Sequence, residues 1–161
     1  MVTPINSANS VKTDIFYIND VHGQIPKMER LVSASHAFDE YVKNKSVDSF
    51  KVSAGDILLG ENTKTNHIAA KFLDIAGIKL STIGNHELDK GFHPFKDFVK
   101  NIKTKFLGTN MNFPDGKDDR IVLSNIQEIN GNKYGFLGIQ PSSLTTRIKD
   151  KERMSDRKSV V

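Results

Sequence analysis

The chain has 161 residues, of which 37% are hydrophobic and 26% are charged, and its formal net charge is +4. These values are typical of one globular domain, and no apolar run approaches the roughly 18 residues needed to cross a bilayer. The absence of cysteine excludes disulfides, thiol catalysis and zinc–cysteine sites, so any metal must be held by Asp, His, Asn or Glu side chains. The first 14 residues are polar, and we expect no secretory signal in this chain.

Strands and helices alternate along the first two thirds of the chain. Short runs rich in β-branched and aromatic residues predict strands at 14–19, 50–54, 78–83 and 105–107. Apolar residues at helical spacing predict helices over 28–44, 63–76 and 94–102. This alternation predicts an α/β fold, with a mainly parallel sheet and covering helices.

The pattern changes after the fourth predicted strand. Residues 120–129 and 133–139 are strand-like, and the Asn130-Gly131-Asn132 segment between them is a strong hairpin signal. We therefore expect a C-terminal β-hairpin as an antiparallel margin of the sheet. Residues 115–119 predict an exposed turn before it.

Charge is unevenly distributed, because residues 142–161 hold six basic and three acidic side chains. A basic segment of this kind could contact nucleic acid or an anionic surface. The alternating signs in this segment favour a solvated end instead. We expect neither a nucleic-acid partner nor a membrane partner.

Polar side chains follow each of the first three predicted strands. These segments are Asn19–Gly23, Gly55-Asp56 and Gly84–Glu87. Because the carboxyl ends of parallel strands open into one crevice, we expect the three segments to converge. Carboxylate, imidazole and amide ligands suit Mn, Fe, Zn or Mg, and two such ions can hold a phosphate.

The segments IFYINDVHGQ, SAGDILLG and STIGNHELDKG resemble the first three motifs of the calcineurin-like metallophosphoesterases. The resemblance is greatest to the 5′-nucleotidase and 2′,3′-cyclic nucleotide phosphodiesterase branch, and it runs from about Asp14 to about Leu144. It implies the first half of a four-layer α/β/β/α fold. The implied organisation is an extended or disordered arm at 1–13, a partial metallophosphoesterase-like domain at 14–144 and a basic mixed-charge tail at 145–161.

The resemblance also implies a set of metal ligands. Asp20 and His22 would bind the first of two divalent ions (Mn, Zn, Fe or Mg), Asp56 would bridge both, and Asn85 would bind the second. On the residues alone, Asn85 could instead satisfy backbone groups of a turn.

Two further residues receive catalytic roles from the resemblance. His86 would face the phosphate, stabilise developing charge and protonate the leaving oxygen, and Asp89 would orient it. Without the motif, His86 could be a buried core histidine and Asp89 a residue at a helix start. Glu87 also matches a motif position, and we expect a structural role for it.

The activity implied is hydrolysis of phosphate esters of nucleotides by a metal-bridged hydroxide. The family pattern continues into a second half with further histidine ligands, but the last histidine here is His93, with none in the final 68 residues. We therefore expect an amino-terminal half that is weakly active or inactive alone. The alternative is a non-catalytic half-fold that serves as a binding or assembly module, as a homo-oligomer or with a missing C-terminal half. Family members are often extracytoplasmic.

Overall fold

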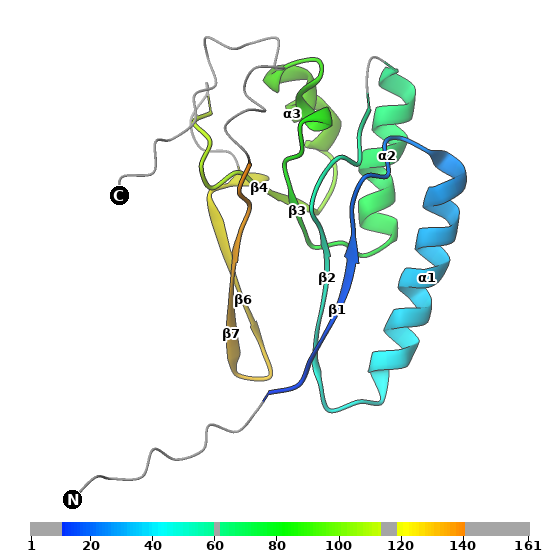
Figure 1. Ribbon diagram of the computed structural model, residues 1–161, viewed down its shortest axis with the longest axis vertical. Coiled ribbons are helices and arrows are strands. Elements are labelled where there is room, and N and C mark those ends of the chain that lie inside the picture. Colours follow the sequence, from blue (N-terminus) through cyan, green and yellow to red (C-terminus); the bar gives the residue numbers. More distant parts are fainter. Residues whose placement is uncertain (1–10, 60–61, 114–118, 141–161) are drawn as a thin grey trace, which may run out of the picture.

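The computed structural model describes residues 11–59, 62–113 and 119–140 (Figure 1). Five strands form one sheet in the order β1-β2-β3-β4-β5, and each neighbouring pair is parallel. The strands are β1 (Thr13–Ile18), β2 (Asp48–Ser53), β3 (Leu80–Thr82), β4 (Lys105–Leu107) and β5 (Ile121–Val122). The predicted α/β fold with a parallel sheet is thus confirmed.

Three α-helices cover one face of this sheet (Figure 1). They are α1 (Ile25–Lys43), α2 (Thr63–Ile75) and α3 (Phe92–Val99), and a short 3₁₀ helix, η1 (His86–Leu88), precedes α3. Each α-helix lies within a few residues of its predicted range; α3 begins earlier than expected, after Gly91 at φ 95°. In the described part of the chain, no helix has the length and apolar character that crossing a membrane requires.

The hairpin forms, but its expected place as a margin of the sheet is wrong. Strands β6 (Ser124–Ile129) and β7 (Asn132–Leu137) make a separate antiparallel pair on the face opposite the helices (Figure 1). The ring of Phe50 in β2 packs edge-on against Tyr134 and Phe136, with centroids 4.5 and 5.1 Å apart. β5 takes the edge position beside β4 instead, because the run expected as one strand over 120–129 is interrupted at Leu123.

The main core lies between the helices and the sheet. Four aromatic side chains are buried in it: Phe92, Phe95, Phe98 and Phe106. His36, His67 and His93 are exposed. Most of the predicted arm (1–13), most of the predicted turn (115–119) and the whole predicted tail (145–161) lie outside the described residues.

Candidate metal centre

The loops that follow β1 and β2 are joined by backbone hydrogen bonds. The donors are the N–H groups of Asp20, His22 and Gly23, and the acceptors are the carbonyls of Gly55, Asp56 and Ile57, at 3.2, 3.0 and 2.8 Å respectively. Since β1 and β2 are parallel neighbours, both loops leave the same end of the sheet. This pairing fixes the two loops against one another where the predicted ligands lie.

Three of the predicted metal-binding residues adopt the left-handed backbone conformation. The φ angles are 53° at Asp20, 52° at His22 and 55° at Asp56. Such values are uncommon outside glycine, although Asp and His tolerate them better than most residues, and strained backbone concentrates at functional sites. The paired loops hold all three residues in this conformation.

Two glycines allow the β2 and β3 loops to touch through their backbones. A Cβ on Gly55 would lie 2.6 Å from the backbone nitrogen of Gly84. A Cβ on Gly84 would collide with the Asp56 carboxylate and lie 2.6 Å from Glu87 Oε2. Both positions therefore exclude side chains.

His22, Asp56 and His86 come together at this end of the sheet. One ligand atom from each lies within 4.8 Å of the others, and all three residues are partly buried. The two imidazole rings meet edge-on with centroids 4.8 Å apart. An imidazole–carboxylate–imidazole group of this size matches the donor set that Mn, Fe and Zn prefer.

The His22 ring carries an orphaned polar atom. Its Nε2 is buried and makes no hydrogen bond to any described residue, although Asp20 Oδ1 lies 3.3 Å away. A buried polar atom without a partner is costly, and a metal ion between the imidazole and the carboxylate would satisfy it. The residues present therefore fit a divalent cation.

His86 contacts both Asp89 and Asp56. Its Nδ1 lies 2.8 Å from Asp89 Oδ2, and its backbone N–H donates to Asp56 Oδ1 at 3.0 Å. With Nδ1 engaged by a carboxylate, Nε2 is the ring atom left for a phosphate or a metal. The catalytic roles of this pair stay predictions.

The remaining predicted ligands, Asp20 and Asn85, flank the three-residue group. The side chain of Asp20 is 55% exposed and adjoins the group through His22. Asn85 is partly buried at the start of η1 and makes no side-chain capping hydrogen bond there. The side chain of Asn85 therefore does not cap η1.

Glu87, for which the motif predicts a structural role, is a buried residue. Its side chain is 2% exposed and accepts hydrogen bonds from four backbone N–H groups. Burial raises the pKa of this carboxyl, and the hydrogen bonds from the loop after β2 oppose the rise only in part. The motif position predicted a structural role for Glu87, but it did not predict that the carboxylate would be buried among backbone N–H groups.

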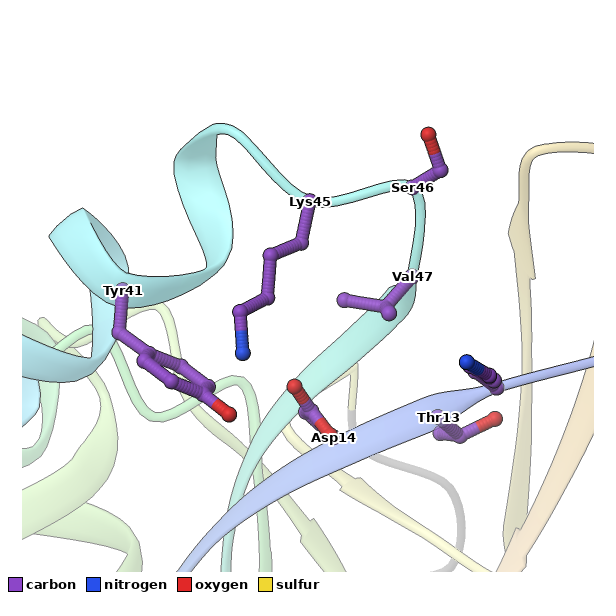
Figure 2. Close-up of a pocket in the computed structure, with 7 residues that line it drawn as sticks. Thr13, Asp14, Tyr41, Lys45, Ser46 and Val47 are labelled. Atoms are coloured by element: carbon purple, nitrogen blue, oxygen red, sulfur yellow. The ribbon is translucent and has the colours of Figure 1, made fainter.

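A hollow lies at the end of the sheet opposite the candidate metal centre, where β1 and β2 begin (Figure 2). Lys45 reaches toward Tyr41 and Asp14, and its Nζ sits 3.1 Å from the centroid of the Tyr41 ring. The lysine is thus already held by an aromatic ring. None of the predicted site residues lines this hollow.

Comparison with known proteins gives relatives of similar fold. The cell wall protein Lmo0130 of Listeria monocytogenes is 24% identical over 96% of this chain and 26% of its own length. A 5′-nucleotidase precursor from Thermus thermophilus superposes with a TM-score of 0.70 at 17% identity, covering 88% of this chain and 31% of its own. A putative 5′-nucleotidase from Staphylococcus aureus gives a TM-score of 0.69 at 18% identity, covering 91% of this chain and 32% of its own.

The chain therefore spans about a third or less of the length of these relatives. The profile of the calcineurin-like phosphoesterase family matches residues 13–158, which is most of the sequence. With this match, and with the parallel sheet that gathers the three motifs at one end, the chain belongs to the calcineurin-like phosphoesterase family.

Proposed function

We propose that this chain carries part of a divalent-metal site that hydrolyses phosphate esters of nucleotides, as a 5′-nucleotidase does. The observation that carries the proposal is that two of the proposed ligands, His22 and Asp56, converge with the proposed catalytic residue His86 within 4.8 Å. Family membership and the names of the Thermus and Staphylococcus structures support it.

Four residues would hold two metal ions in this proposal. Asp20 and His22 would hold the first ion, Asp56 would contact both, and Asn85 would hold the second. Bound Mn, Zn, Fe or Mg ions supply Lewis-acid stabilisation of a phosphoryl group and a nucleophile at neutral pH. The left-handed conformations of Asp20, His22 and Asp56 would orient their carboxylate and imidazole groups for this purpose.

His86 would act on the substrate rather than on the metal. Its Nδ1–H donates to Asp89, which fixes the orientation of the ring. The protonated Nε2 would then stabilise charge on the phosphate and donate a proton to the leaving oxygen.

Isothermal titration with Mn²⁺ tests the metal site directly. We expect the wild-type chain to bind Mn²⁺ and Asp56→Asn to bind it at least about tenfold more weakly. Asp39→Asn is the matched control, because Asp39 is a carboxylate on α1 that pairs with Lys51 at 2.7 Å. Absence of Mn²⁺ binding by the wild-type chain contradicts the proposal.

Hydrolysis assays test the substrate class. Phosphate release from 5′-AMP that needs Mn²⁺ and is lost in Asp56→Asn supports a nucleotide phosphoesterase. Equal rates on 5′-AMP and a simple aryl phosphate contradict a preference for nucleotides.

A second candidate is a non-catalytic assembly module, which one observation favours. Large apolar side chains stay exposed on β1 and around the end of β7: Ile15 at 58%, Tyr17 at 56%, Leu137 at 64% and Ile139 at 67%. Exposed apolar groups beside a sheet edge favour association. Sedimentation velocity decides, because a chain that stays monomeric up to high concentration contradicts this candidate.

We also propose that the protein is located outside the cytoplasm. This location is supported by the naming of the Listeria relative as a cell wall protein. Fractionation of the producing cells tests it, and recovery in the cytosol alone contradicts it.

A further inference from the structure

We infer that Glu87 is a positioning residue whose buried carboxylate fixes Asp56 against the loop that carries Asn85 and His86. The inference rests on the proposed function, since it concerns the same metal site. It assigns to Glu87 a role through Asp56 rather than any contact with substrate.

The carboxylate of Glu87 joins two loops that are some thirty residues apart in sequence. Oε1 accepts from the N–H groups of Ile57 and Leu58 at 2.8 and 3.1 Å. Oε2 accepts from the N–H groups of Asp56 and Gly84 at 2.9 and 2.6 Å. Three of the donors lie in the loop after β2 and the fourth lies in the loop after β3, so one side chain ties both together.

These bonds hold Asp56 in its strained conformation. The backbone N–H of Asp56 is bound to Glu87, and its carboxylate accepts the N–H of His86 at 3.0 Å. Asp56 is therefore held at its backbone and at its side chain by consecutive residues of one short helix. Without Glu87, the φ angle of 55° at Asp56 would lose one of the restraints that hold it, beside the pairing with the β1 loop.

Glutamate is the side chain that this position requires. A glutamine would direct an NH₂ donor at backbone N–H donors, because one end of its amide cannot accept. An aspartate is one methylene shorter and cannot keep all four bonds. Four buried N–H groups need two acceptor oxygens, which a glutamate at this position supplies.

Asp48, the first residue of strand β2, provides a matched control. It is also a buried carboxylate, 3% exposed, but it lies at the opposite end of the strand and binds the hairpin. A substitution there perturbs a buried carboxylate without touching the loops of the metal site.

The experiment measures Mn²⁺ affinity by isothermal titration on folded samples of the wild type, Glu87→Gln and Asp48→Asn, with circular dichroism as the check of folding. We expect at least tenfold weaker binding in Glu87→Gln and binding within twofold of wild type in Asp48→Asn. In an Asp56→Asn background, Glu87→Gln should produce no further loss. The inference is overturned if Glu87→Gln binds Mn²⁺ as tightly as the wild type. It is also overturned if Glu87→Gln and Asp48→Asn lose Mn²⁺ affinity equally.

Amide hydrogen exchange gives a readout that needs no metal. In Glu87→Gln, or in Glu87→Asp should the glutamine variant not fold, the amides of Asp56, Ile57, Leu58 and Gly84 should exchange at least tenfold faster than in Asp48→Asn. Unchanged exchange overturns the positioning role. If the wild type binds no Mn²⁺ while these amides still respond, the proposed function fails and the tie between the loops stands.

Discussion

Two buried carboxylates at opposite ends of the sheet are held in different ways. Glu87, beside the metal centre, accepts hydrogen bonds from four backbone N–H groups. Asp48, at the start of β2, accepts from the side chains of Asn130, Asn132 and Tyr134 in and beside the hairpin turn. The first holds loops to each other, and the second holds a hairpin that lies more than 80 residues further along the chain.

The pKa values of the two carboxyls are displaced in opposite directions. Burial is the largest influence on Glu87 and raises its pKa, whereas the hydrogen bond from the Tyr134 hydroxyl is the largest influence on Asp48 and lowers its pKa. The comparison teaches that the number of donors alone does not set the direction of a pKa shift, since the residue with more hydrogen bonds has the raised pKa. The chain has no cysteine and hence no disulfide, and each of these two carboxylates joins segments that are distant in the sequence.

The largest expected effect is that of Glu87→Ala. The substitution leaves four buried N–H groups without their acceptor and opens a cavity, so we expect a loss of about 3–5 kcal/mol in the free energy of unfolding. Urea denaturation followed by circular dichroism measures it. A loss below about 1 kcal/mol would show that water or a neighbouring group replaces the carboxylate.

Gly84→Ala should follow in size. The added methyl group collides with the Asp56 carboxylate and with Glu87. We expect this overpacking to cost about 1–3 kcal/mol and to displace the Asp56 carboxylate. Thermal unfolding and Mn²⁺ titration of the variant check both consequences. Gly135→Ala is the control for methyl insertion, because a Cβ there meets no atom within 4 Å.

Asp48→Asn should destabilise the chain less than Glu87→Ala. The amide keeps one acceptor oxygen but turns a donor toward the donors of the hairpin. We expect a lower urea midpoint together with unchanged Mn²⁺ affinity. A change in affinity would mean that the two ends of the sheet are coupled.

The smallest expected effect is the pH dependence of the difference in unfolding free energy between the wild type and Asp48→Asn. Because the folded pKa of Asp48 is lowered, its contribution to stability is complete above the ordinary aspartate pKa of about 3.9 and is lost as pH falls through the lowered value. The difference in unfolding free energy between wild type and Asp48→Asn should therefore shrink in acid. Urea titrations across the acid range measure it, and a constant difference contradicts the assignment.

Alternation of strands and helices was enough to predict which segments share the site. Residues that follow consecutive parallel strands must emerge at one edge, which is why Asp56 and His86 could be brought together from spacing and motif. The position of the hairpin could not be predicted, because it depends on Tyr134 and Phe136 meeting Phe50 across more than 80 positions. The periodicity of a short run shows which side of a strand is apolar. It does not show which other strand that side will pack against.

The sequence also could not predict which charged residues are buried. Glu87 and Asp48 are polar in sequence, and only their hydrogen-bond donors, which other segments provide, make burial tolerable. For the site itself, the sequence predicted Asp20, His22, Asp56 and Asn85 as metal ligands with His86 beside them, and the structure brings His22, Asp56 and His86 within 4.8 Å of one another.

The left-handed conformations of Asp20, His22 and Asp56 carry an evolutionary consequence. Glycine would relieve backbone strain at each of these positions and remove a proposed metal ligand at the same time. Screening random variants for heat resistance alone should therefore enrich glycine first at Asp20, because its side chain is 55% exposed whereas the His22 ring packs against His86. Retention of Asp20 under such screening would indicate that something other than stability preserves it.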